Sequence, residues 1–519
     1  MDNDPGMSIF YERLQPQEKL VPAPREGSDA AAAQDAMMVR NDSRRVSRRK
    51  VVSNNGSYFP ERYARMLVII PAHDEEKSIV GTLQEIIRQS RRPDKVVVVA
   101  DNCTDDTEGE VRKFMRKHPE VELMVTRNNT QRKVGALNQA WLLYSQGFDL
   151  VATIDADTIL WQDVLGDLEE ELVPRTRCAG IMAKFTFDQD WIPPELRKSK
   201  EPARGSDEDP INTKLPWTAR QLLRAQRMEF TAQTMDFLRH GRQSYVLGGQ
   251  ATLFRQDALL RAAYFNNGYG PWNADTDVED MELTWRFQEL KLETLVSRTA
   301  RAYAGAMYNT KSLWAQRRKW DEGMARLLLK YKIGKNTYYP WLRQLKMGLD
   351  LVVRIMFVLM LTVSVALHSF VWSWLWLIPS LLSVLLNVKL FFKMPKRTLA
   401  DFFFAVTYFP TEIYLWFRLA GFAASWGSAL MGTKKDNWAG QKAAESGGGS
   451  AGSAGAMILG TLLVLVITMV ISLSVMPRHM ADTTVAVGWA IMKTLTIILS
   501  VQMALKLMYM ILRDRRLVA

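Results

Sequence analysis

The sequence contains few cysteines and few histidines, and this scarcity limits the kinds of site it can build. Its 519 residues include two cysteines, Cys103 and Cys178, and five scattered histidines. Two cysteines are too few for the disulfide framework of a small secreted domain. No spacing of cysteine and histidine resembles a zinc site. We interpret Cys103 as a small packing residue.

Long apolar runs are missing from the front of the sequence, whereas most of the chain beyond Lys346 is strongly apolar. No N-terminal apolar run resembles a signal peptide, so we expect the front of the protein to stay in the cytosol. The net charge of +12 and the pI of about 9.5 would suit either nucleic acid or an anionic membrane. The basic residues flank apolar segments and form no aromatic-interleaved face, which favours membrane lipids and excludes nucleic acid as a partner.

Residues 1–60 mix Pro, Gly, Ala, Asp and Ser without a sustained period, which predicts a disordered basic tail. Positive charge is concentrated at residues 40–50. This stretch is either a solvated tail or a segment that rests on anionic lipid, where each basic residue contributes about 1 kcal/mol.

Residues 61–345 are expected to form one cytoplasmic α/β domain with a doubly wound, mostly parallel sheet, because strand patterns alternate with helix patterns. We expect Asp74–Glu76 to lie in the first turn of the first helix, where the helix dipole favours acids. The expected strands cover residues 65–71, 95–100, 121–126, 150–157 and 180–185, and the first helices cover residues 79–87 and 135–145.

Acidic residues follow three of these strands, at the strand ends where ligands of such sheets bind. They are found at residues 71–75, at Asp101, and at Asp155 and Asp157. On a strand ending at Asp157, Asp155 and Asp157 would share one face. Paired carboxylates repel each other unless a cation is present, and hard oxygen ligands favour Mg²⁺ or Mn²⁺ together with substrate phosphates. The alternative is a strand followed by an Asp that caps a helix.

The apolar half predicts four membrane crossings, each close to the roughly 20 residues that a bilayer requires. Basic clusters after the second crossing and at the C-terminus keep those ends in the cytoplasm. Residues 399–430 are interpreted as an interfacial helix broken near Pro410, although a further crossing there remains an alternative. The expected segments are two crossings and the interfacial helix in 346–430, a cytoplasmic Gly/Ser-rich loop at 431–456, and two crossings with a basic tail in 457–519.

Six short stretches, taken together, resemble family 2 glycosyltransferases with the GT-A fold, in the membrane-integrated branch that includes cellulose, chitin and hyaluronan synthases. The resemblance covers about residues 64–330, and further on it is one of architecture. A lone Asp-X-Asp pair is common by chance, but six stretches in the family's order are a specific signal. They are VIIPAHDEE at 68–76, DNCTDD at 101–106, KVGALN at 133–138, DAD at 155–157, ED at 279–280 and QRRKW at 316–320.

The resemblance implies a role for each matching residue. Asp101 would accept a hydrogen bond from a uracil N–H, and Asp280, beside Glu279, would be the general base. Asp155 and Asp157 would form the metal pair, with Asp157 as the direct ligand. The nucleotide sugar would be bound by Ala72, Asp74, Glu75, Asp101, Lys133 and Asp155, and the acceptor and diphosphate by Gln316, Arg317, Lys319 and Trp320.

The sequence departs from the family pattern at two places. Lys319 stands where the family usually has Arg, and Lys lacks the planar fork that grips phosphates at two points. Arg317 and Arg318 would compensate for this loss. Asp74 replaces the usual Asn and adds negative charge to the pocket. For Trp320, an interfacial anchor near the membrane is the alternative interpretation.

We therefore expect a metal-dependent, inverting glycosyltransferase, integral to the membrane, that uses a nucleotide sugar (a UDP-sugar) and a carbohydrate or lipid-linked acceptor. Acidic neighbours of Asp280 would raise its proton affinity, as a base requires. The product is either a growing polysaccharide or a single-sugar adduct. The competing hypothesis is a non-catalytic membrane scaffold that only binds nucleotide, in which Asp277, Glu279 and Asp280 merely begin a helix.

Overall fold

The computed structural model describes residues 64–187, 215–432 and 467–517, apart from residues 367, 369, 371 and 473. The chain divides into two compact units. The first unit comprises residues 1–205 and 234–305, and the second comprises residues 206–233 and 306–519.

The first unit is built on one mixed sheet, and its described residues supply eight strands in the order β3-β2-β1-β4-β7-β6-β8-β5. β1 pairs in parallel with β2 and β4, and β2 pairs in parallel with β3. β7 runs antiparallel to β4 and β6, whereas β6 and β8 are parallel. The strands are β1 Met66–Ala72, β2 Lys95–Asp101, β3 Val121–Thr126, β4 Leu150–Thr153, β5 Ile159–Leu160, β6 Cys178–Phe187, β7 Thr252–Arg255 and β8 Glu293–Ala304.

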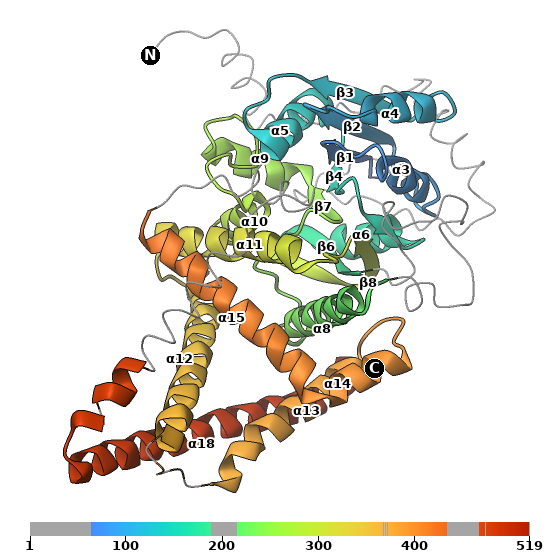
Figure 1. Ribbon diagram of the computed structural model, residues 1–519. Helices are drawn as coiled ribbons and strands as arrows, with labels where there is room; N and C mark the ends of the chain where they lie inside the picture. Colours follow the sequence, from blue (N-terminus) through green and yellow to red (C-terminus); the bar gives the residue numbers. More distant parts are fainter. Residues whose placement is uncertain are drawn as a thin grey trace, which may run out of the picture. The chain divides into compact units, whose positions relative to one another are not determined.

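Helices cover both faces of this sheet, because its central strands are apolar on both sides. In β1, Val68 belongs to one hydrophobic core and Ile69 to the other. A near-continuous apolar run is typical of a parallel strand covered on both faces. Figure 1 shows α3 and α4 on one side of β1 and β2, and α5 and α9 on the other. The helices are α3 Ile79–Ile87, α4 Thr107–Met115, α5 Arg132–Tyr144, α6 Val164–Leu172, α9 Gln256–Phe265 and α10 Glu279–Glu289. The expected α/β class with a doubly wound sheet is confirmed.

Two local expectations are wrong. β4 ends at Thr153, so Asp155 and Asp157 lie in the turn that follows it and do not share a strand face. The Asp155 N–H donates to the Gly249 carbonyl, and the Asp155 carbonyl accepts from the Thr158 N–H, which closes the turn. The first turn of α3 contains no acid, because the helix begins at Ile79, after Ser78.

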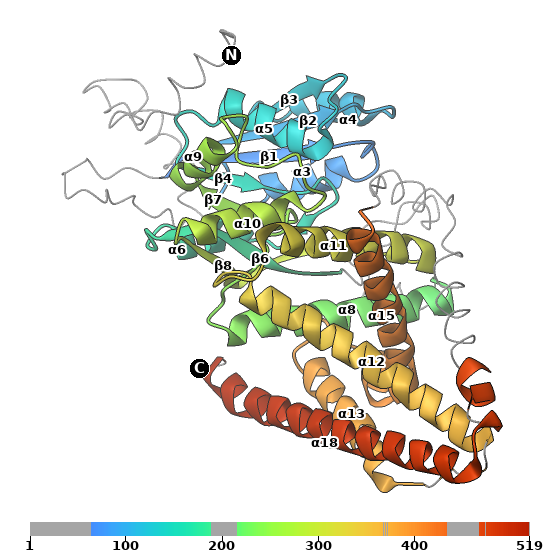
Figure 2. The same ribbon diagram turned by 90° about the vertical axis from the view of Figure 1, so that its left-hand side faces the viewer.

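The second unit is helical. Three of its described helical segments are long and apolar enough to cross a membrane: residues 338–366, 374–391 and 478–513. Residues 374–391 join the short helix η2, Trp374–Trp376, to α13. α18 packs against α12 and α13 (Figure 2), where the Trp489 indole N–H donates to the Ser364 hydroxyl at 2.7 Å. The helices are α11 Thr310–Tyr331, α12 Tyr338–Ala366, α13 Leu377–Phe391, α14 Leu399–Val406, α15 Tyr408–Leu430 and α18 Arg478–Leu517, with α8 Trp217–Arg239 beginning in this unit.

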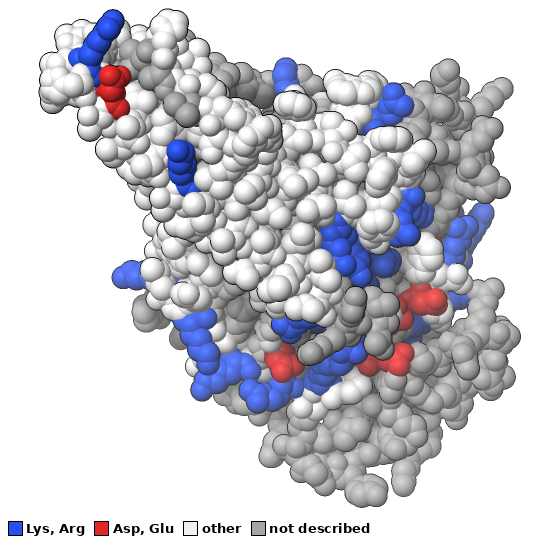
Figure 3. Space-filling view, turned by 90° about the horizontal axis from the view of Figure 1, so that it is seen from below, with Lys and Arg blue, Asp and Glu red and all other residues white. Residues whose placement is uncertain are grey.

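The expected break near Pro410 is present, since Thr407 separates α14 from α15. Pro410 lies in the first turn of α15, where a missing N–H removes no intrahelical bond. Seen from below in Figure 3, the helices of this unit present a broad uncharged surface with Lys and Arg near its margin. Large apolar side chains such as Leu381 and Phe409 are exposed on these helices. The expected tail at 1–60, most of the expected loop at 431–456 and most of the expected crossing at 457–475 lie outside the described residues.

Candidate active site

The acidic residues of the first unit follow strands whose carboxyl ends meet at one edge of the sheet. β1, β2 and β4 are parallel, and Ala72 at the end of β1 pairs with Ala100, one residue before Asp101. Asp74 follows β1, Asp101 ends β2, and Asp155 follows β4. The parallel register therefore brings the three expected acidic positions to the same edge, which is where doubly wound sheets bind ligands.

Lys133, near the start of α5, lies among three carboxylates at this edge. Its Nζ is 2.6 Å from Asp155 Oδ1 and 3.7 Å from Glu279 Oε1. Glu279 is buried, with 6% of its surface exposed. Burial lowers the pKa of Lys133, but Asp155, Glu279 and Asp280 outweigh it and raise the pKa above its usual value. Lys133 is thus a fixed positive charge at the centre of an acidic cluster.

Asp280 occupies the first turn of α10, beside Glu279. Burial, followed by the Glu279 carboxylate, raises the pKa of Asp280 to about 7, although Lys133 and the Met281 N–H oppose the rise. Its Oδ1 accepts the Met281 N–H at 2.8 Å. A carboxylate with this pKa exchanges a proton near neutral pH, as a general base requires.

Gly249 lies against the ion pair of Lys133 and Asp155 and allows these two side chains to pack closely. A Cβ added at this position would lie 2.7 Å from Lys133 Nζ and 2.8 Å from Asp155 Oδ1. Only a residue without a side chain leaves room for the ion pair. The sequence shows two adjacent glycines here but does not show which groups approach them.

Asp101 is buried, and its carboxylate is held by neighbours that the motifs do not include. Its Oδ1 accepts the Thr126 hydroxyl at 2.6 Å and the Asn129 amide at 2.8 Å. His73 Nδ1 lies 2.6 Å from the Asp101 carbonyl oxygen. Sequence reasoning missed Thr126 and Asn129, although both follow the pattern of polar residues at the end of a parallel strand.

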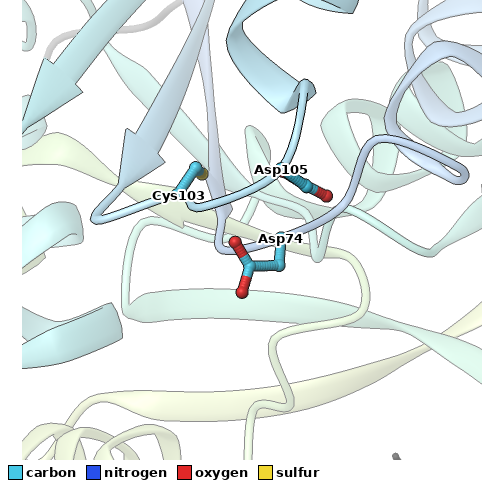
Figure 4. A group of neighbouring side chains, drawn as sticks. All are labelled: Asp74, Cys103 and Asp105. Carbon is cyan, nitrogen blue, oxygen red and sulfur yellow. The ribbon is translucent and has the colours of Figure 1, made fainter.

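Asp74, Cys103 and Asp105 come together in the loops after β1 and β2 (Figure 4), with their potential ligand atoms within 4.8 Å of one another. Asp74 Oδ1 accepts from the Thr104 N–H at 2.6 Å, and Asp105 Oδ2 accepts from the Glu76 N–H at 3.0 Å. Burial raises the pKa of Cys103, which keeps it a thiol and disfavours metal ligation. These contacts join the loop after β1 to the loop after β2.

Glu75 contributes to the same loop junction. Its N–H donates to the Thr107 hydroxyl at 2.8 Å, and its carboxylate accepts the Ser78 hydroxyl. These two hydrogen bonds hold the loop that contains Asp74 and Glu75 and follows Ala72.

The second unit places the QRRKW stretch on α11, with Gln316, Arg317 and Lys319 buried and Trp320 half-buried. The Arg317 guanidinium lies 4.6 Å from the centre of the Trp320 ring and donates to the Gln316 side-chain oxygen. It also donates through Nε and Nη2 to Glu229 Oε2, at 3.1 and 3.0 Å. Arg317 is therefore engaged in holding its neighbours, and its role toward a diphosphate stays a prediction.

Known proteins resemble parts of this chain. It is 31% identical over 112 residues to a dolichyl-phosphate beta-glucosyltransferase of Trichomonas vaginalis, covering 20% of this chain and 32% of that protein. It is 20% identical to a poly-beta-1,6-N-acetyl-D-glucosamine synthase of Staphylococcus epidermidis, covering 54% of this chain and 58% of that protein. The chain thus spans only about a third to three fifths of these curated relatives.

Among solved structures, a mannosyltransferase of Pyrobaculum calidifontis in complex with GDP-Man and Mn²⁺ aligns with 96% of this chain and 99% of its own, at 13% identity and a TM-score of 0.37. The sequence model of Glycosyl transferase family 2 matches residues 67–240. These residues include β1, β2 and β4 and every acidic strand end described above. The chain therefore contains a domain of glycosyl transferase family 2, the family that its motifs resemble.

Proposed function

We propose that this protein is a membrane-bound, inverting glycosyltransferase that moves a sugar from a nucleotide sugar, a UDP-sugar, to a hydroxyl acceptor. The observation that carries the proposal is the cluster of Lys133, Asp155, Glu279 and Asp280 at the carboxyl edge of a family 2 sheet. A module that only binds nucleotide requires no carboxylate with a pKa near 7. The cluster supports catalysis over the scaffold hypothesis.

In the proposed reaction, Asp280 accepts the proton of the acceptor hydroxyl. The acceptor oxygen forms a bond to the anomeric carbon as the bond from that carbon to the diphosphate oxygen breaks. Both events occur in one displacement, so the anomeric configuration inverts. The nucleoside diphosphate leaves as an anion, and Lys133 provides positive charge near it. Asp101 accepts a hydrogen bond from the uracil N–H.

Asp155 and Asp157 are the residues proposed to hold a divalent cation, Mg²⁺ or Mn²⁺. Both are half-buried and offer hard carboxylate oxygens in the turn after β4, a donor set that fits these ions. The cation, when bound, neutralises charge on the departing diphosphate. The structure pairs Asp155 Oδ1 with Lys133 at 2.6 Å, so a positive charge already offsets that carboxylate.

The apolar helices of the second unit support a multi-pass membrane protein whose first unit is cytoplasmic. The similarity to a polysaccharide synthase supports a carbohydrate acceptor and repeated transfer. The similarity to a dolichyl-phosphate transferase supports a lipid-linked acceptor and single transfer. Product length decides between the two.

The experiment that tests the proposal uses the full chain, solubilised in detergent, and screens nucleotide sugars for hydrolysis with Mg²⁺, Mn²⁺ or EDTA. We expect one UDP-sugar to be turned over in the presence of metal, and Asp157→Ala to abolish turnover. Full activity of Asp157→Ala would refute the metal assignment. If wild-type protein hydrolysed no nucleotide sugar, the proposed function itself would be refuted.

A further inference from the structure

A single carboxylate in the second unit connects three helices around the QRRKW stretch. Glu229 of α8 accepts two bonds from Arg317 of α11 and the Tyr414 hydroxyl of α15 at 2.6 Å. Arg418 of α15 places its Nε 3.0 Å from Glu229 Oε1. Glu229 lies outside all six family-like stretches.

Arg317 connects this carboxylate to the two residues expected at the acceptor end. Its guanidinium stacks 4.6 Å from the Trp320 ring centre and donates to the Gln316 side-chain oxygen. Phe230, the residue after Glu229, packs edge-on against Trp320, with 6.1 Å between the two ring centres. The Trp320 ring is therefore held by an Arg whose own position depends on Glu229.

The two arginines depend on Glu229 to different degrees. Arg418 has a second carboxylate, since its Nη1 donates to Asp321 Oδ2 at 2.8 Å. Within the described part of the chain, Arg317 has no second carboxylate in an ion pair. Removing the charge of Glu229 would leave a guanidinium that is 2% exposed without its counter-ion, and such a group has to move toward water.

We propose that Glu229 is a positioning residue for the acceptor, because it fixes Arg317 and, through Arg317, the orientations of Gln316 and Trp320. The role in acceptor binding rests on the proposed function, whereas the contacts of Glu229 with Arg317 do not depend on it. It assigns to α8 a part in acceptor binding, although α8 has no residue in the motifs.

A matched control exists on the same helix. Arg227 of α8 donates to Asp401 of α14 at 2.8 Å, and Asp401 is buried with 2% of its surface exposed. Asp401→Asn removes a carboxylate from an ion pair with α8, as Glu229→Gln does, but among the described residues Asp401 forms no hydrogen bond or ion pair with Arg317 or Trp320. Both variants are expected to lower stability, and only Glu229→Gln is expected to move Trp320.

The first readout is the fluorescence of Trp320, obtained by subtracting the emission of a matched variant that also has Trp320→Phe. We expect Glu229→Gln to shift this emission to longer wavelength, because the ring loses its packed cation, and Asp401→Asn to leave it unchanged. Tyr414→Phe removes one bond from Glu229 without removing its charge, so a smaller shift in the same direction is expected. This milder variant serves if Glu229→Gln does not fold. Equal Trp320 emission in all of these variants would overturn the inference.

The second readout separates donor chemistry from acceptor binding. With the UDP-sugar that wild-type protein hydrolyses, we expect Glu229→Gln to keep hydrolysis by water within twofold of wild type. Transfer to short N-acetylglucosamine oligosaccharides should fall by roughly tenfold to a hundredfold, mainly through a higher acceptor KM. Equal losses of hydrolysis and transfer would mean a merely structural role. Absence of hydrolysis by wild type would refute the proposed function, and the fluorescence result would still decide the positioning role.

Discussion

The two units contain charge clusters of opposite composition. In the first unit, one cation, Lys133, lies among the carboxylates of Asp155, Glu279 and Asp280. In the second, one carboxylate, Glu229, lies among the cations Arg317 and Arg418. The first cluster has more acids than its cation can neutralise, whereas in the second both cations are neutralised, because Arg418 also pairs with Asp321.

This difference decides which cluster titrates. Burial, followed by the Glu279 carboxylate, raises the pKa of Asp280 to about 7, so that group changes charge near neutrality. Burial acts to raise the pKa of Glu229, but Arg317, Arg418 and the Tyr414 hydroxyl lower it from 4.5 to about 2. Because this folded-state pKa is depressed, the contribution of Glu229 to stability is present above pH 4.5 and is lost as the pH falls toward 2. The first cluster suits proton transfer, and the second suits fixed structure.

The largest effect is expected from Asp280→Asn, which removes the titrating group of the first cluster. The amide cannot accept the proton of the acceptor hydroxyl, so kcat for transfer should fall by roughly 10²- to 10⁴-fold. Product formation with labelled donor measures the loss. Asp275→Asn removes an exposed acid of the same loop and should keep nearly full activity. Equal activities of the two variants would remove Asp280 as the base and would favour the scaffold hypothesis.

The pH profile should show that Lys133 holds the pKa of Asp280 down. In wild type, transfer should fall about tenfold per pH unit below pH 7, where Asp280 becomes protonated. Lys133→Met removes a charge that lowers this pKa, so the acidic limb should move to higher pH, by roughly one unit. The measurement is kcat/KM against pH for both proteins. An unchanged limb, or a move to lower pH, would contradict the electrostatic comparison.

The sequence predicted β1, β2 and β3 well because near-continuous apolar runs mark parallel strands, whereas β5 and β8 were not among the expected strands. The strand at Val121–Thr126 and the helix at Ile79–Ile87 have the expected bounds. The turn at Asp155 was missed because the Asp155 N–H donates to the carbonyl of Gly249, which is distant in sequence. An apolar run in the sequence does not show at which residue a strand stops hydrogen-bonding to its neighbours.

The site was predicted less completely than the sheet. Motifs indicated Lys133, Asp155 and Asp280 through the resemblance. The contact between Glu229 and Arg317 joins residues 88 positions apart, and the sequence around either residue does not predict it. Thr126 and Asn129 support Asp101 from a neighbouring strand end in the same way. Long-range partners of buried charges require the structure.

A moderate effect is expected from Gly249→Ala, which tests how closely the first cluster has to be packed. The new Cβ would approach Lys133 Nζ at 2.7 Å and Asp155 Oδ1 at 2.8 Å, so the ion pair has to open. We expect turnover to fall by roughly tenfold to a hundredfold, with little change in the midpoint of thermal unfolding. Gly81→Ala in α3 is the control, because its Cβ would meet no atom closer than 3.9 Å. Wild-type turnover by Gly249→Ala would show that the close ion pair is dispensable.

The smallest effect is expected from Asp74→Asn, which removes one negative charge from the loop after β1 and keeps a side-chain oxygen that can accept the same hydrogen bond. Asp74 has a φ of 58°, a conformation that Asn also tolerates, and its Oδ1 accepts the Thr104 N–H, which an amide oxygen can equally do. Stability should therefore change by no more than about 0.5 kcal/mol. Because the excess of acid at this edge repels a diphosphate, the donor KM should fall, by roughly twofold to fivefold at low salt, and the difference should shrink as salt screens the charge. Donor KM at two ionic strengths measures it. A higher KM for Asp74→Asn would mean that this carboxylate contributes to donor binding, as the family resemblance implies, and that its charge does not simply repel the diphosphate.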